Sequence, residues 1–221
     1  MEVDKQLLSE IKKDLLIKKI YNFFSQYKKA IIICLILLVI SLVSYVGYRL
    51  YINNLANKNS IVFSDIKDKL SEKNNEEALK LLDDLIKNGT NGYVFLSYME
   101  KAYVFLNNGE SDKAVAILQE AYSKITLPQY YKDIVQNISF VIRMNEDKNL
   151  DVLAKDIKNS LNQDSHLYFN NLEMYATLLV INKKYSDALP YFVEIINAEK
   201  APRLLKERAK RIKALLLGYI N

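Results

Sequence analysis

Few residues in this chain have side chains that could carry out catalysis. His166 is the only histidine, and Cys34, the only cysteine, lies inside a long apolar run. A histidine-based triad and a histidine-rich metal site are therefore excluded, and no intramolecular disulfide can form. The acidic pair Asp83-Asp84 lies in a lysine-rich segment, which favours a solvated helix face over a general acid/base pair. We expect a protein that is not an enzyme and that binds no metal, cofactor or small-molecule substrate.

A second group of residues has the pattern of a binding surface. The segment from Val94 to Leu106 would be apolar nearly all round as a helix. One stripe of this helix should face its partner helix, and a second stripe should face the concave side of a helical stack. The second stripe consists of Leu96, Met99, Tyr103 and Leu106, and the matching positions later in the chain are Asn170, Glu173, Thr177, Val180 and Ile181. An exposed apolar stripe in a groove is typical of a partner-binding site. The alternative is that neighbouring hairpins bury this stripe.

The feature that decides the topology of the chain is an uncharged run of 19 residues, Ala30 to Tyr48. As a helix rising about 1.5 Å per residue, it is about 28 Å long, close to the hydrocarbon thickness of a bilayer. The run is too long for the apolar part of a secretory signal, and no small-residue cleavage site follows it. Tyrosines gather at its end, where aromatic rings favour the membrane interface. Residues 30–51 are therefore predicted to form one transmembrane helix.

Charge on the two flanks of this run predicts its orientation. Six lysines precede it within residues 12–29, whereas only Arg49 and Lys58 follow it over a similar length. Because basic flanks stay in the cytoplasm, residues 1–29 are predicted to be a cytoplasmic leader and the larger part of the chain to be exported. Residues 4–27 carry apolar side chains at helical spacing. This segment either lies on the membrane surface as an amphipathic helix or continues the transmembrane helix.

The exported part of the chain has almost no net charge. Residues 50–221 contain 23 basic and 22 acidic side chains. Nucleic-acid binding needs a clustered basic surface, so no nucleic-acid partner is expected. Positive charge does gather in the last twenty residues, on one face of a predicted helix. That face is either a solvated surface or a docking surface for anionic headgroups or for an acidic partner.

The exported part repeats itself about every 37 residues. Glycine and proline are scarce, with five and three residues, and apolar residues recur at helical spacing, which predicts an all-α fold. Four segments each contain an apolar helix, a short polar turn, a capping residue and a second helix. The expected capping residues are Asn75, Ser111, Asn149 and Ser186, which are 36, 38 and 37 residues apart.

The second and fourth segments carry the clearest pattern, and the third is degenerate. Small residues at Ala102 and Ala114, and again at Ala176 and Ala188, let paired helices approach closely. This pattern resembles the tetratricopeptide repeat, a unit of 34 residues that forms a helical hairpin. The resemblance implies an α-solenoid of about four hairpins, with a C-terminal helix that caps the stack.

These interpretations divide the chain into five parts. A basic leader occupies residues 1–29, a transmembrane helix residues 30–51, and a linker or helix extension residues 52–60. The repeat domain occupies residues 61–200, with hairpins at about 61–92, 93–127, 129–163 and 167–200, and the capping helix occupies residues 201–221.

The first sixty residues carry a second likeness. Tyr27-Lys28-Lys29 precedes the apolar run, and Gly47-Tyr48-Arg49-Leu50-Tyr51 closes it. This arrangement resembles the N-terminal signature of the YfgM-like ancillary subunits of the SecYEG translocon, which are membrane-anchored repeat proteins of proteobacteria. The hairpin from Tyr98 to Ala121 and the ending from Pro202 to Leu216 also resemble that family, but the family's usual Trp near Tyr51 is absent.

The resemblance implies a single-pass protein of the bacterial inner membrane, with a cytoplasmic N-terminus and a non-enzymatic repeat domain in the periplasm. The implied partners are the SecYEG translocon, a membrane-anchored periplasmic chaperone and exported chains, in addition to membrane lipid. On this basis we expect an adaptor that assists the hand-over of secreted proteins to the chaperone. The alternative is a structural scaffold of the envelope or of cell division that uses the same repeats.

Overall fold

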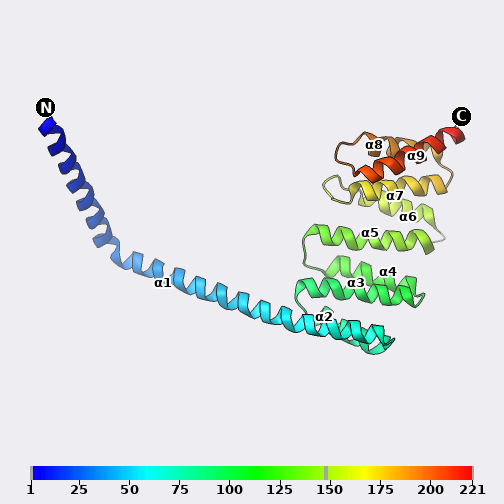
Figure 1. Cartoon of the computed structure of the whole chain (residues 1–221), viewed down its shortest axis with the longest axis horizontal. Helices are drawn as coiled ribbons and strands as arrows, with labels where there is room; N and C mark the ends of the chain where they lie inside the picture. The colour runs from blue at the N-terminus through cyan, green and yellow to red at the C-terminus, as the bar shows by residue number, and fades with distance from the viewer. Residues whose placement is uncertain (1, 147–148, 221) are drawn as a thin grey trace. The chain divides into compact units, whose positions relative to one another are not determined.

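The computed structural model describes residues 2–146 and 149–220 (Figure 1). Every regular element in these two ranges is an α-helix, which confirms the predicted all-α fold. The chain divides into two compact units, Met1–Leu55 and Ala56–Asn221. Helix α1, Glu2–Ser71, contributes residues to both units.

The first unit consists of the N-terminal part of α1. Apart from half-buried Ile31, the large apolar side chains of the predicted span are exposed, with values between 46 % at Ile32 and 67 % at Val43. A core helix of a water-soluble protein would bury such a run, because apolar side chains gain free energy when they leave water. Within the described residues, Ser25–Ser71 is the stretch that is long and apolar enough to cross a membrane. α1 continues from the leader into the span as one helix assignment, and the position of residues 4–27 relative to a membrane stays a prediction.

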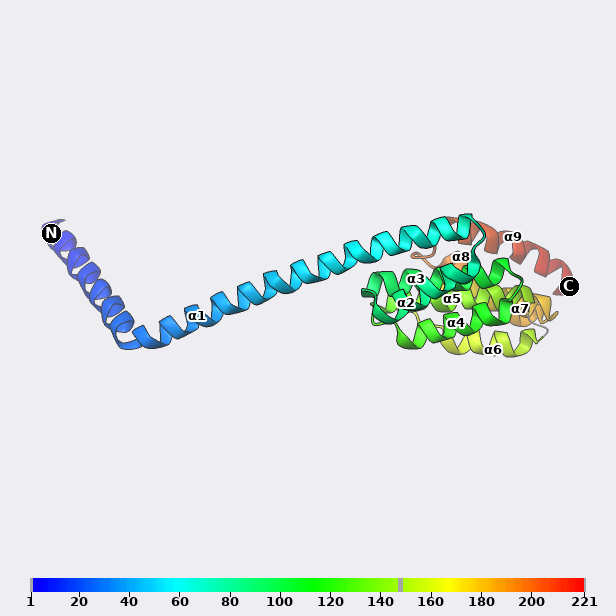
Figure 2. The same cartoon turned by 90° about the horizontal axis from the view of Figure 1, so that it is seen from below.

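The second unit is a stack of helical hairpins that follow one another in chain order (Figure 1), and the hairpins overlap when the stack is seen from its α2 end (Figure 2). The end of α1 pairs with α2, Asn75–Asn88, and α3, Asn91–Asn107, pairs with α4, Ser111–Lys124. α5, Gln129–Glu146, pairs with α6, Leu150–Ser160, and α7, Tyr168–Ile181, pairs with α8, Tyr185–Asn197. α9, Arg203–Ile220, closes the stack against α8 and α7. This arrangement confirms the four predicted hairpins and the C-terminal capping helix.

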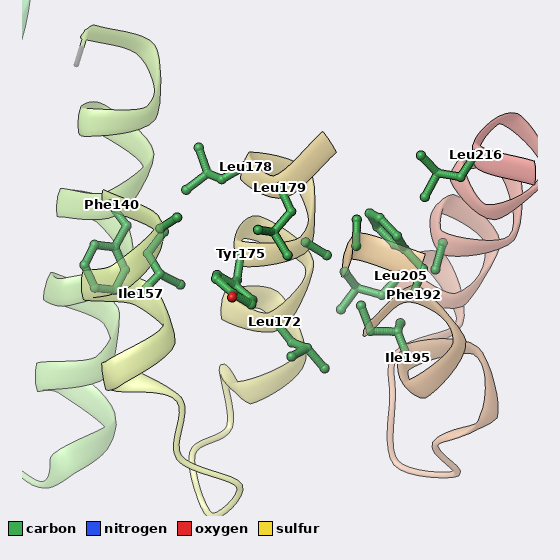
Figure 3. Close-up of a cluster of buried hydrophobic side chains, with 14 of the residues drawn as sticks. Phe140, Ile157, Leu172, Tyr175, Leu178, Leu179, Phe192, Ile195, Leu205 and Leu216 are labelled. Atoms are coloured by element: carbon green, nitrogen blue, oxygen red, sulfur yellow. The ribbon is translucent and has the colours of Figure 1, made fainter. Parts of the chain in front are cut away.

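The buried side chains of the stack form three clusters. One joins α1 and α2 and contains Ile66 and Leu82. Another joins α3, α4 and α5 and contains Tyr98 and Leu118. The largest joins α5 to α9 and includes Phe192, which is fully buried (Figure 3). Burying one such side chain stabilises a fold by about 1.5–3 kcal/mol relative to leaving it in water, so each helix gains stability from its neighbours in the stack.

Small residues set the spacing within most of these hairpins. Four residues after the N-cap, the second helix carries Ala78, Ala114 or Ala188, and each is fully buried. The third hairpin has Leu153 at this place, and Phe140 is buried in the same cluster. Because these two side chains are larger than alanine, α5 and α6 pack more loosely than α3 and α4 or α7 and α8. The degenerate sequence of the third repeat thus has a structural counterpart.

Three of the four predicted capping residues are wrong by one or two positions. Asn149 is an N-cap, as predicted, and its side chain accepts a hydrogen bond from the Val152 amide at 3.3 Å. The other N-caps are Asn74, Glu110 and Lys184, in place of Asn75, Ser111 and Ser186. Each turn has several adjacent polar residues, and their intrinsic preference alone does not decide which of them ends the turn.

The turns between paired helices share a backbone requirement. The residue before the N-cap has a positive φ at Lys73 (62°), Gly109 (74°) and Lys183 (59°). This left-handed conformation suits glycine, but it costs a residue with a Cβ about 1–2 kcal/mol. Two lysines therefore occupy places where glycine would be less strained.

Lys183→Gly should stabilise the repeat domain by about 1 kcal/mol, because it removes this strain. Gly109→Ala should destabilise it by about the same amount. A Cβ at position 109 would meet no heavy atom within 4 Å, so the cost there is backbone strain alone. Chemical denaturation of the full chain in detergent, followed by circular dichroism, measures both effects. A lower denaturation midpoint for Lys183→Gly than for the parent chain would contradict this account.

Candidate partner-binding surface

The predicted apolar stripe on α3 is partly open to solvent. Leu96 is 41 % exposed and Tyr103 is 55 % exposed. Met99 and Leu106 are half-buried and pack against the cluster that joins α3, α4 and α5. Neighbouring helices therefore cover Met99 and Leu106 in part, as the alternative predicts, but they leave Leu96 and Tyr103 exposed. What remains open is a pair of large side chains about two helical turns apart.

The matching stripe on α7 is more polar and less exposed. Asn170, Thr177 and Val180 are half-buried, and Ile181 is 51 % exposed. The Thr177 hydroxyl donates a hydrogen bond to the Glu173 carbonyl within the same helix at 2.8 Å. The α7 stripe thus offers a partner less apolar surface than the α3 stripe does.

Glu173 is engaged by another helix of the same domain. Its two carboxylate oxygens accept hydrogen bonds from Nε and Nη2 of Arg208 on α9, at 2.8 and 2.6 Å. Such a two-point pair is directional, and Glu173 raises the pKa of the Arg208 guanidinium. Glu173 therefore positions α9 against α7. Its contact with an external partner stays a prediction, as does partner binding by the other residues of both stripes.

Polar contacts hold α3 in place from two sides. On one side, the Tyr98 hydroxyl donates a hydrogen bond to Glu120 on α4 at 3.2 Å. Burial raises the pKa of Tyr98 to about 12, and the neighbouring Glu120 carboxylate adds to the shift. On the other side, Lys101 pairs with Asp83 on α2 at 2.5 Å. The exposed side chains of α3 are therefore presented by a fixed helix.

A polar cleft between α4, α5 and α6 was not expected from the sequence. Two adjoining cavities there, of about 400 and 290 Å³, share Tyr122, Gln136, Asp156 and Asn159 in their walls. Arg143 on α5 donates a hydrogen bond to Asp156 on α6 at 2.9 Å. The cleft lies beside the loosely packed α5 and α6. Leu153, in place of a small residue, is the one sequence signal that could have indicated it.

Two observations concern the residue types that could hold a metal ion or carry out catalysis. Within it, no group of three or more His, Cys, Asp or Glu side chains could hold a metal ion. His166 is exposed and lies edge-on to Tyr130, with ring centroids 5.6 Å apart.

Comparison with known proteins gives one result. A family model described as a tetratricopeptide repeat-like domain matches residues 21–166, well over half of the chain. The match includes the apolar run and the first three hairpins, and it ends before α7. No curated protein and no solved structure matches the chain.

Tyr98 predicts a pH dependence of stability. An unfolded tyrosine has a pKa of about 10, whereas Tyr98 keeps its proton up to about pH 12 in the folded chain. As the pH rises from 10 to 12, the unfolded state loses this proton first, so the free energy of unfolding falls. In the Tyr98→Phe variant, the free energy of unfolding should fall less between pH 10 and pH 12 than it does in the parent chain. Equal losses in denaturation experiments at the two pH values would contradict the assignment.

Proposed function

Because this chain belongs to the family of tetratricopeptide repeat-like domains, we propose that it is a non-enzymatic membrane adaptor whose repeat domain binds protein partners. The observation that carries the proposal is the exposed pair Leu96 and Tyr103 on α3. Large apolar side chains on a fixed helix are good anchors for a partner, because burying them is favourable and costs little conformational entropy. The apolar N-terminal helix supplies the attachment to the membrane.

The finer proposal concerns place and partner. We infer that the chain lies in a bacterial inner membrane, with its leader in the cytoplasm and its repeat domain in the periplasm. The lysine-rich flank of the span supports this orientation. We further propose an ancillary translocon subunit that helps hand secreted proteins to a membrane-anchored chaperone, as the resemblance to the YfgM-like family implies. Partners in the same membrane are present at high effective concentration, so each contact can be weak.

Single-cysteine labelling tests the orientation cleanly, because Cys34 is the only cysteine of the chain. In a Cys34→Ser background, Lys155→Cys places an exposed thiol in the repeat domain, and Lys19→Cys places one in the leader. A membrane-impermeant maleimide added to spheroplasts should label position 155, and it should label position 19 only after permeabilisation. The reverse pattern would place the repeat domain in the cytoplasm.

Crosslinking tests the partner. Photo-crosslinking residues at Leu96 and Tyr103, in the full chain in its membrane, should capture translocon subunits, a periplasmic chaperone or exported chains. Val152, which is 49 % exposed on α6 and lies outside both stripes, is the matched control and should capture none of them. Capture of unrelated envelope proteins alone would refute the translocon proposal. Concentration of a fluorescent fusion at division sites would favour a scaffold.

A further inference from the structure

The two predicted stripes share a fixed relation to the buried residues of their helices. On α3 the stripe starts two residues before Tyr98, and on α7 it starts two residues before Leu172; both of these residues are buried. From that start the stripe recurs at the third, seventh and tenth residues, which lie on one helix face. Helices that stack with equivalent faces buried present equivalent faces on the same side of the stack. The register can therefore be extended to α9.

On α9 the positions equivalent to Asn170, Glu173, Thr177 and Val180 are all cationic, and Ala214 is equivalent to Ile181. Leu205 and Ala209 are buried at the places of Leu172 and Ala176. The α9 stripe therefore consists of Arg203, Lys206, Lys210 and Lys213. Arg203 and Lys210 are exposed, and Lys206 and Lys213 are half-buried. The ion pair between Arg208 and Glu173 holds this helix directly beside the α7 stripe.

These cations differ from the basic side chains that hold the stack together. Lys67, Lys101, Arg143, Lys184 and Arg208 each pair with a carboxylate on another helix. Among the described residues, Arg203, Lys206 and Lys213 have no carboxylate partner, and Lys210 pairs with Glu207 of its own helix. The stripe on α9 therefore contributes no ion pair to the packing of the domain.

The position of two of these cations is also unfavourable for the helix. Arg203 and Lys206 lie in the first turn of α9, which contains no acidic residue. The N-terminus of a helix carries partial positive charge, so cations there are disfavoured and acidic residues are preferred. This interaction lowers the stability of the fold, and no contact among the described residues of the domain offsets it. Such unfavourable positions are expected where residues serve a function.

The net charge of the domain also differs between α9 and the rest of the stack. Residues 56–202 contain 17 basic and 21 acidic side chains, whereas α9 contains six basic residues and one acidic residue. This excess of positive charge on α9 gives the α9 end of the stripe a preference for negatively charged partners.

We propose that the α9 end of the stripe binds an acidic polypeptide segment, while the α3 end takes apolar side chains of the same partner. This inference rests on the proposed function and adds the chemistry of the partner: a chain segment that combines acidic residues with large apolar ones. A polypeptide matches the geometry better than a bilayer does. The stripe has members on α3, α7 and α9, which one extended chain can contact in turn, whereas a flat membrane would use the cations of α9 alone.

Binding of labelled peptides to the full chain in detergent tests this proposal. One short peptide alternates glutamate with leucine and tyrosine, and a second carries glutamine in place of every glutamate. Fluorescence anisotropy should detect binding of the acidic peptide, weakened by added salt, and much weaker binding of the glutamine peptide. Arg203→Gln with Lys206→Gln should reduce the affinity for the acidic peptide about tenfold, as expected for the loss of two partly screened ion pairs.

The matched control is Lys87→Gln with Lys155→Gln, which neutralises two exposed lysines outside the stripe and should leave the affinity unchanged. Thermal unfolding provides a second readout: the α9 variant should be at least as stable as the parent chain, because it relieves the unfavourable charge at the helix N-terminus. Lower stability together with lost binding would mean that these cations serve the fold, and this would overturn the proposal.

Other outcomes also decide the question. Equal binding of the two peptides, no binding of the acidic peptide, or an equal loss in the control variant overturns the proposal. So does binding to phosphatidylglycerol vesicles, and not to the peptide, that depends on Arg203 and Lys206. If crosslinks at Leu96 and Tyr103 still capture partners in that case, the adaptor function stands and only the acidic specificity fails. If those crosslinks fail as well, both proposals fall.

Discussion

A single helical hairpin of this size cannot bury the apolar faces of both its helices, and the rest of the repeat domain follows from that constraint. Each hairpin is stable because the next one covers it. α5 shows how the cover is shared: Val135 and Ile142 join the cluster of α3 and α4, while Phe140 joins the cluster that extends to α9. The domain thus has a continuous interior without a central core, and its surface is correspondingly long.

The binding surface is a by-product of this stacking. Burying equivalent faces of α3, α7 and α9 leaves equivalent faces of these three helices on the same side of the stack. On α3 that face keeps Leu96 and Tyr103 in solvent, and on α9 it carries cations. Ion pairs such as Lys101–Asp83 and Glu173–Arg208 fix the helices that present these faces. The same side chains therefore secure the stack and align the residues that are free to bind.

Much of this architecture could be predicted from the sequence. Apolar residues at helical spacing and small residues at Ala102, Ala114, Ala176 and Ala188 are enough to indicate helices and their pairing, because packing depends on side-chain volume and period. The exact turn ends could not be predicted, since adjacent polar residues such as Asn74 and Asn75 have nearly equal capping preference. The sequence predicts Glu173 as a partner-binding residue, but its ion pair with Arg208 could not be predicted because the two residues lie 35 positions apart. Leu153, in place of a small residue, marks the third hairpin as unusual, but the width of the cleft beside α6 depends on how α5 and α6 pack in three dimensions.

The loose packing of α5 against α6 has a further consequence for how the domain comes apart. In a stack that touches only its neighbours, cooperativity passes from one interface to the next and weakens at the poorest of them. α5 packs closely on α4, whereas α6 belongs to the cluster of α7, α8 and α9. We therefore expect the domain to unfold as two parts that meet between α5 and α6. Under a pulling force, or in an amide-exchange experiment, the interface between α5 and α6 should open first. The middle of the domain can then open while both of its ends stay folded.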